Sequence, residues 1–213
     1  MEEPLAADGL RGFLHHPDHP DGSALALTHG AGSDCRSPLL MRVAERFAAA
    51  GSLVLRYDLP YRLEGRRTPP LPAAQFRDRQ GVLRAVEFLR SRCSGPVFAG
   101  GHSYGGRQTA MAAAENAKLA DALLLLSYPL HPPDHPERPR TTFFPDWQIP
   151  ALFVHGTRDP FGTVDEIREA LKLIRVRVEL LPVEGAAHDL KRGGASVMDA
   201  IVQRFRALVY PEN

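Results

Sequence analysis

The sequence contains few cysteines and no long apolar run. Its two cysteines, Cys35 and Cys93, are too few for a disulfide framework and lack the spacing of a zinc site. No apolar run approaches the roughly 18 to 20 residues that span a bilayer, and the acidic first residues are unlike a signal peptide. We therefore expect a cytoplasmic protein that has no membrane partner.

A large net charge is also absent. The 26 Lys and Arg residues nearly balance the 25 Asp and Glu residues, which leaves a formal net charge of +1. This balance gives no global reason to expect a nucleic-acid partner. The hydrophobic content of 44% is typical of a folded globular protein, and a chain of 213 residues fits one domain spanning 1–213.

Short apolar segments alternate along the chain with segments of helical periodicity. This alternation predicts right-handed crossovers and hence an α/β fold, a three-layer α/β/α sandwich with a mostly parallel sheet. Residues 129–150 contain seven prolines, so we expect a Pro-rich loop there, alone or with one short helical turn, and no cap domain. The expected strands are 9–16, 23–28, 52–57, 96–100, 121–127, 151–156 and 177–183, and the expected helices are 37–50, 73–92, 104–118, 164–173 and 194–209.

One segment has the pattern of a nucleophile elbow. Gly101-His102-Ser103-Tyr104-Gly105 matches G-x-S-x-G, with an apolar strand before it and an alanine-rich helix after it. The sharp turn from strand to helix forces the serine into an unfavourable backbone conformation. It also leaves no room for side chains two residues away, so glycine is needed there. The pattern predicts Ser103 as a nucleophile, and the alternative is a glycine-rich turn whose serine is passive.

A serine nucleophile needs a base, and the base needs an acid. His188 follows the last expected strand in a segment of small residues, and we predict it as the base. Asp159 follows the strand 151–156, at a carboxyl end of the sheet, and we predict it as the acid that orients the base. The alternatives are Asp134 as the acid, His188 as a surface histidine that caps the last helix, and Asp159 as a turn or N-cap carboxylate.

The charge that develops on the substrate oxygen needs preorganised N–H donors. The residue after the nucleophile, Tyr104, is predicted as one backbone donor. The loop His29-Gly30-Ala31-Gly32 follows the first long strand, and its glycines let the backbone come close to the site. We therefore predict the N–H of Ala31 as the second donor, with Gly32 as the next choice and a generic turn as the alternative.

A site without a cap domain is expected to be shallow, with walls made of loops. Arg62, together with Arg66 and Arg67, follows the carboxyl end of a strand. These arginines either favour an anionic acyl or leaving group or form a solvated basic loop. The aromatic residues of the Pro-rich loop either line the pocket or fasten the loop to the core. The candidates for substrate contacts are Gly32, Arg62, Phe143, Trp147 and Phe161.

Five segments together resemble one superfamily: His29–Gly32, Asp58–Arg62, Gly101–Arg107, Ser127–Pro132 and His155–Gly162. They resemble the α/β-hydrolases, which use the chain order Ser, Asp, His. Within this superfamily, the sequences of these segments are similar to a compact, cap-less, dienelactone-hydrolase-like branch. That branch includes testis-expressed hydrolase-like proteins and a subunit of a histone acetyltransferase complex. The resemblance implies a serine-hydrolase fold, and some relatives act within protein assemblies. Dienelactone hydrolases use a cysteine nucleophile, so Ser103 departs from them and their substrate is not carried over.

The residues and the resemblance together predict a serine hydrolase. Its expected substrate is a small ester, thioester or related acyl compound, and its chemistry requires no metal and no organic cofactor. A non-catalytic binding module that keeps the fold is the first alternative, because a fold alone does not give a function. Acyl transfer to an acceptor other than water, or peptide cleavage, is the second alternative.

Overall fold

The computed structural model describes residues 1–192 and 194–211. The strands of this part of the chain are β1 (Glu2–Ala7), β2 (Leu10–His15), β3 (Ala24–Thr28), β4 (Leu53–Tyr57), β5 (Val97–His102), β6 (Leu123–Leu126), β7 (Ala151–Gly156) and β8 (Val178–Val183). They form one sheet in the order β1-β2-β4-β3-β5-β6-β7-β8. β2 pairs antiparallel with both β1 and β4, and every other neighbouring pair is parallel.

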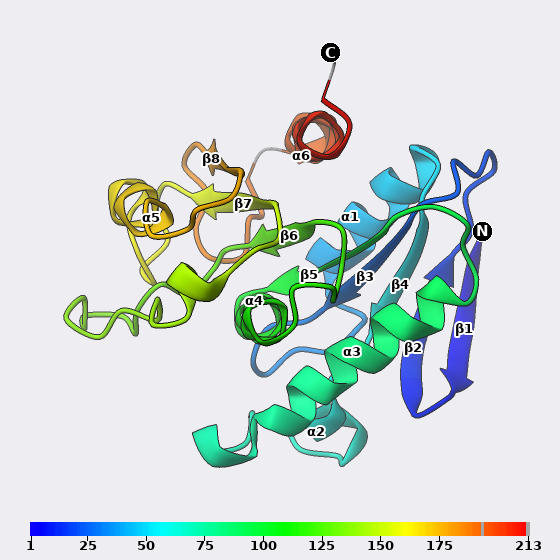
Figure 1. The fold of residues 1–213 in the computed structure, drawn as a ribbon, viewed down its shortest axis with the longest axis horizontal. Coiled ribbons are helices and arrows are strands. Elements are labelled where there is room, and N and C mark those ends of the chain that lie inside the picture. The colour runs from blue at the N-terminus through cyan, green and yellow to red at the C-terminus, as the bar shows by residue number, and fades with distance from the viewer. Residues whose placement is uncertain (193, 212–213) are drawn as a thin grey trace.

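Helices cover both faces of this sheet (Figure 1). Helices α1 (Pro38–Ala49) and α6 (Gly194–Val209) lie on one face, and α3 (Phe76–Arg90) and α4 (Tyr104–Glu115) lie on the other. On the first face Phe205 of α6 packs edge-on against Phe47 of α1 and Phe98 of β5. The predicted three-layer α/β/α sandwich with a mostly parallel sheet is confirmed. None of the described helices is long and apolar enough to cross a membrane.

The central strands are apolar on both faces because helices cover both sides of them. β6 is four consecutive leucines, all buried, and every residue of β3 is buried as well. The remaining helical elements are short: α2 (Pro60–Leu63), α5 (Val164–Leu171) and the 3-10 turns η1 (Pro72–Ala74) and η2 (Phe144–Asp146). The turn η2 is the short helical turn foreseen in the Pro-rich loop.

The sequence prediction was incomplete at the N-terminus, where β1 was missed. β1 and β2 are joined by Asp8 and Gly9, whose φ angles are both positive, 56° and 71°. This is the backbone of a tight hairpin turn, and Asp-Gly between two strands is its usual sequence. The dipeptide was therefore a usable signal, but the acidic, mostly exposed residues of β1 lack the apolar alternation of a half-buried strand.

The parallel strands bring distant segments of the chain to one edge of the sheet. The loops that follow β3, β5, β7 and β8 begin with His29, Ser103, Thr157 and Glu184, all at the carboxyl ends of neighbouring or nearby strands. Ligands in open α/β sheets bind at this edge. The predicted nucleophile, base, acid and oxyanion loop thus meet although they are separated by up to about 160 residues of sequence.

Candidate active site

Ser103 lies on the turn between β5 and α4 and has a strained backbone. Its φ is 50° and its ψ is −116°, a conformation that side-chain-bearing residues rarely adopt. A Cβ added at Gly105 would lie 2.4 Å from the carbonyl oxygen of His29, whereas the N–H of Gly105 donates to that same oxygen at 3.1 Å. Glycine at this position therefore lets the first turn of α4 dock against the loop after β3.

A continuous chain of hydrogen bonds runs from Ser103 to a buried carboxylate. The Oγ of Ser103 lies 2.7 Å from Nε2 of His188, and Nδ1 of His188 lies 2.8 Å and 3.0 Å from the two carboxylate oxygens of Asp159. The side chain of Asp159 is fully buried, and that of His188 is 21% exposed. The protein thus shields the acid while it leaves the histidine and serine open to a ligand.

Two neighbours restrict the position of His188. Nε2–H of His102 donates to the carbonyl oxygen of His188 at 2.8 Å, and the ring of Phe161 lies 4.3 Å from the imidazole of His188. Burial lowers the pKa of His102 to about 4, so its ring is neutral near pH 7. His102 therefore acts here as a neutral hydrogen-bond donor that holds the loop carrying His188.

The carboxylate of Asp159 is itself fixed by its loop. Its Oδ1 accepts a hydrogen bond from the N–H of Phe161 at 2.9 Å. The other acid considered from the sequence, Asp134, lies exposed in the Pro-rich loop at a positive φ of 60°. Asp159, rather than Asp134, is the aspartate in contact with His188.

Two backbone N–H groups near Ser103 have no protein partner. Within residues 1–192 and 194–211, the N–H groups of Tyr104 and Ala31 donate to no protein atom. The loop after β3 also passes very close to the elbow, because a Cβ added at Gly30 would lie 3.3 Å from the Cβ of Ser103. Among the described residues, both N–H groups predicted as oxyanion donors thus have no protein partner.

The side chain of Tyr104 points away from the site. Its hydroxyl donates to Oδ2 of Asp78 in α3 at 2.6 Å, and the other carboxylate oxygen accepts from the N–H of Tyr61 at 3.2 Å. Asp78 is fully buried, and burial raises its pKa. The side chain of Tyr104 therefore anchors the start of α4 to α3.

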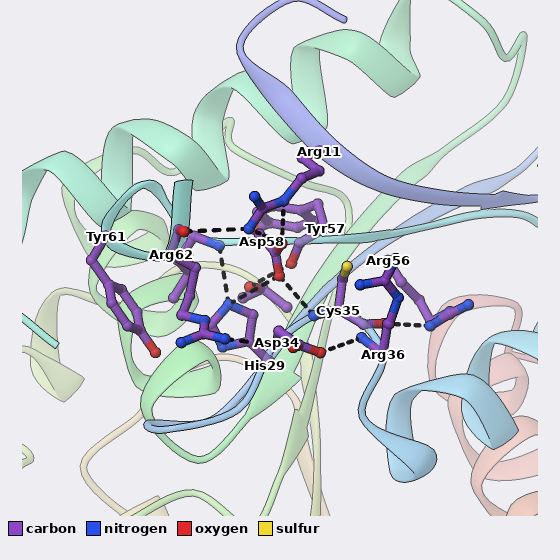
Figure 2. Close-up of polar contacts among 12 residues, drawn as sticks. Arg11, His29, Asp34, Cys35, Arg36, Arg56, Tyr57, Asp58, Tyr61 and Arg62 are labelled. Carbon is purple, nitrogen blue, oxygen red and sulfur yellow. Dashed lines mark hydrogen bonds and ion pairs between the residues drawn. The ribbon is translucent and has the colours of Figure 1, made fainter. Parts of the chain in front are cut away.

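A second buried network fixes the loop after β3 (Figure 2). Nε2 of His29 accepts from the N–H of Leu59 at 3.1 Å, and Nδ1 of His29 lies 2.9 Å from the carbonyl oxygen of Gly30. A ring protonated at Nδ1 satisfies both contacts. Asp58 accepts from the N–H of Cys35 at 2.7 Å and from Nε of Arg11 at 2.8 Å. These bonds tie the loop to the end of β4.

A cavity of about 550 Å³ opens beside the nucleophile. The chain encloses it with the loop after β3, the first turns of α1 and the segment around His188. Among the residues that the structure describes, Phe161 is the one predicted substrate contact that lines this cavity. The lining residues are Gly30, Ala31, Ser33, Ser37, Pro38, Leu39, Arg42, His102, Ser103, Phe161, His188, Asp189 and Lys191.

The predicted contacts from the Pro-rich loop lie elsewhere. Trp147 is buried and packs edge-on against Phe144 and at a tilt against Phe153 of β7. Phe143 stacks on Trp147 at a centroid distance of 6.5 Å. These aromatic side chains join the core on the α3 and α4 face, so Phe143 and Trp147 fasten the loop to the core, which was the alternative considered for them.

The predicted contacts Arg62 and Gly32 are also outside the cavity lining. Arg62 donates to the carbonyl oxygen of Arg66 at 3.0 Å and lies 3.5 Å from Asp34. Arg66 in turn lies 3.7 Å from Glu64 and is well exposed. Arg62 and Arg66 thus contact protein groups near their own loop and do not line the cavity.

The sequence analysis missed the part of the wall that α1 provides. Pro38, Leu39 and Arg42 all line the cavity, and Arg42 shares a helix face with the other two because it follows them by four and three residues. The available signal was the position of the helix, which begins only a few residues after the predicted oxyanion loop. Among the described residues, no three His, Cys, Asp or Glu side chains are arranged to hold a metal ion.

Comparison with known proteins identifies the family. A family model described as an alpha/beta hydrolase domain matches residues 21–206, most of the chain. The chain belongs to this α/β-hydrolase family. The predicted membership of a compact α/β-hydrolase superfamily branch is confirmed, and the match covers every element from β3 to α6 apart from the last residues of α6.

Solved structures show the same fold over nearly the whole chain. The α/β-hydrolase is similar to a dienelactone hydrolase from Anabaena variabilis, with 24% identity, a TM-score of 0.76 and coverage of 98% of this chain and 96% of that one. It is similar to an α/β serine hydrolase without a lid from Xanthomonas campestris (16% identity, TM-score 0.77, coverage 100% and 97%). It is also similar to Est1E from Butyrivibrio proteoclasticus, in a structure with ferulic acid (17% identity, TM-score 0.75, coverage 97% and 99%). These likenesses show a cap-less hydrolase fold.

Proposed function

We propose that this α/β-hydrolase is a serine hydrolase of small esters, thioesters or related acyl compounds. The observation that carries the proposal is the unbroken hydrogen-bonded chain from Ser103 Oγ through His188 to the buried Asp159. A serine hydroxyl is a poor nucleophile until a base takes its proton, and this arrangement supplies an oriented base. One structural neighbour is an α/β serine hydrolase without a lid, which agrees with this chemistry.

The proposed reaction proceeds in two halves. Oγ of Ser103 attacks the acyl carbon while His188 takes the hydroxyl proton, and the resulting oxyanion accepts from the N–H groups of Tyr104 and Ala31. The tetrahedral intermediate then expels the alcohol or thiol, which receives the proton from His188. A water molecule repeats the attack on the acyl-enzyme, giving the free acid and restoring Ser103. Asp159 keeps the imidazole oriented and stabilises its charged form throughout.

The cavity supports a small substrate. Its volume of about 550 Å³ lies within the usual range for small-ligand sites, and no cap covers it. The two free cysteines, Cys35 and Cys93, fit the reducing cytoplasm as the location of the enzyme. We also propose that the whole chain forms one hydrolase domain.

Labelling with a fluorophosphonate probe tests this function. The wild type is expected to be labelled at neutral pH, and Ser103→Ala, which removes only the hydroxyl, is expected to remain unlabelled. 4-Nitrophenyl esters of increasing chain length then test the pocket, and rates are expected to peak at two to four acyl carbons. A wild type that is neither labelled nor active on these esters would leave the non-catalytic binding module as the better explanation.

A further inference from the structure

The cavity beside Ser103 contains three charged side chains besides the imidazole of His188. Arg42 comes from α1, and Asp189 and Lys191 follow His188 in the chain. Nζ of Lys191 lies 2.8 Å from Oδ2 of Asp189, so these two charges compensate each other. His102, on the same wall, is neutral near pH 7 because burial depresses its pKa to about 4. Among the described residues that line the cavity, Arg42 therefore keeps a positive charge that no acidic side chain compensates.

Arg42 is unusual among the arginines of its helix. Within residues 1–192 and 194–211 its side chain makes no hydrogen bond and no ion pair with the protein, and its Nε is buried without a partner. Arg46, one turn further along α1, lies 3.5 Å from Asp199 of α6. A buried N–H donor without a partner is unfavourable. Among the described residues, Nε of Arg62 and of Arg107 is unpaired as well, but of these three arginines only Arg42 lies on the cavity beside Ser103.

An arginine in a binding cavity has a specific chemical preference. The guanidinium group carries its charge at any physiological pH and presents a planar set of N–H donors, which matches the two oxygens of a carboxylate. Arg42 shares its cavity with the Oγ of Ser103, so a ligand anchored by the guanidinium extends into the space in which the acyl group reacts.

We propose that Arg42 binds a carboxylate of the substrate, so that the enzyme prefers small esters or thioesters that carry a negative charge. This inference rests on the proposed hydrolase function. It adds to that function the chemical class of the substrate and the residue that selects it.

Matched pairs of neutral and anionic esters test this preference on the full chain. The first pair is 4-nitrophenyl hydrogen glutarate and 4-nitrophenyl pentanoate, which have equal numbers of acyl carbons and differ in the terminal carboxylate. The second pair, 4-(butanoyloxy)benzoate and phenyl butanoate, places the carboxylate in the leaving group instead. The wild type is expected to show a higher kcat/KM for the anionic ester in at least one pair, and that pair locates the carboxylate.

Substitution of Arg42 is expected to remove the preference. Arg42→Gln should lower the anionic-to-neutral ratio of kcat/KM at least tenfold, mainly through KM for the anionic ester, and Arg42→Lys should retain part of the ratio. Arg46→Gln is the matched control, because it removes an arginine from the same helix outside the cavity, and it should leave the ratio unchanged. A wild type without preference in either pair, or a ratio that Arg42→Gln leaves intact, would overturn the inference.

Binding to an inactive variant separates this inference from the hydrolase function. Calorimetry of 4-nitrophenyl hydrogen glutarate with Ser103→Ala requires no turnover, and binding should weaken at least tenfold in Ser103→Ala/Arg42→Gln. Arg42-dependent binding together with an unlabelled, inactive wild type would retain the anion site and reject the hydrolase. Hydrolysis of both classes of ester without an effect of Arg42 would retain the hydrolase and reject the anion site.

Discussion

The two sides of the nucleophile elbow differ in how completely their polar groups are paired. Behind the elbow, the buried side chains of His29, Asp58 and Asp78 each contact two or more protein groups. In front of it, among the described residues, the N–H groups of Ala31 and Tyr104 have no protein partner. The side chains that hold the loop after β3 and the start of α4 are thus each bonded more than once, whereas these two N–H groups are unpaired.

This difference has a physical basis in preorganisation. Donors that stabilise charge in a reaction are effective when the protein holds them in place and leaves them unpaired until the ligand arrives. Tyr104 contains both requirements in one residue, because its hydroxyl is bonded to Asp78 while its N–H is unpaired beside Ser103. We therefore expect substitutions behind the elbow to change stability as well as activity, and substitutions in front to change substrate preference.

Among the substitutions behind the elbow, Asp58→Ala is expected to have the largest effect on stability. It leaves the N–H of Cys35 buried without a partner and removes the partner of Arg11, so the free energy of unfolding should fall by about 3 to 4 kcal/mol. The loop that carries Ala31 also loses its attachment to β4, and kcat/KM for 4-nitrophenyl butanoate should fall about tenfold. Urea denaturation and steady-state kinetics measure the two effects.

Asp34→Ala is the matched control for this substitution. Asp34 lies in the loop after β3, which Asp58 holds through the N–H of Cys35. It contacts the N–H of Arg36 and the guanidinium of Arg62, but its side chain is 36% exposed. Its removal should cost less than about 1 kcal/mol, as is usual for exposed ion pairs. Equal losses in the two variants would contradict the distinction between a buried support and a solvated one.

The sequence alone predicted the three hydrogen-bonded side chains of the site and most of the fold. G-x-S-x-G is a local steric pattern, so Ser103 and the helix after it followed directly from adjacent residues. His188 and Asp159 followed from the alternation of strands and helices, because parallel strands place their carboxyl ends together. The structure places these three side chains in contact, and each prediction depends on chain order and not on side-chain packing.

The walls of the cavity did not follow from the sequence. Phe143 and Trp147 are aromatic residues of the kind that line pockets. Whether they line the pocket or pack in the core depends on where the Pro-rich loop folds back over the sheet. Arg42 was missed for the same reason, since its pairing depends on which carboxylates α6 presents to α1, and Asp199 reaches Arg46 instead. Long-range packing of this kind leaves no periodic or local signature.

Acid should lower the free energy of unfolding through His102, which holds the loop that carries His188. The pKa of His102 is about 4 in the folded protein, below its ordinary value of 6.5, because burial disfavours the charged ring. As the pH falls from about 6.5 to about 4, the unfolded chain takes up a proton that the folded chain does not. The free energy of unfolding should therefore decrease over this window, by about 2 to 3 kcal/mol from His102.

Denaturation at several pH values between 7 and 4 measures this loss. His102→Gln cannot take up the proton in either state, so its stability should depend less steeply on pH in this window than that of the wild type. His19→Gln, which changes an exposed histidine, should keep the wild-type dependence. The assignment to His102 would be wrong if the two variants had the same pH profile.

The smallest expected effect comes from a substitution that frees a positive charge at the cavity. Asp189 neutralises Lys191 at 2.8 Å, so Asp189→Asn should leave Lys191 as a second uncompensated cation at the cavity. If Arg42 selects a carboxylate, this variant should raise the anionic-to-neutral ratio of kcat/KM about two- to threefold at low ionic strength, and added salt should reduce the gain. Asp165→Asn, a change at an exposed residue of α5 outside the cavity lining, is the control for general effects of charge.

An increase in both variants would mean that net charge, rather than the position of Lys191, attracts the substrate. An increase only in Asp189→Asn would place the carboxylate within reach of the segment that follows His188.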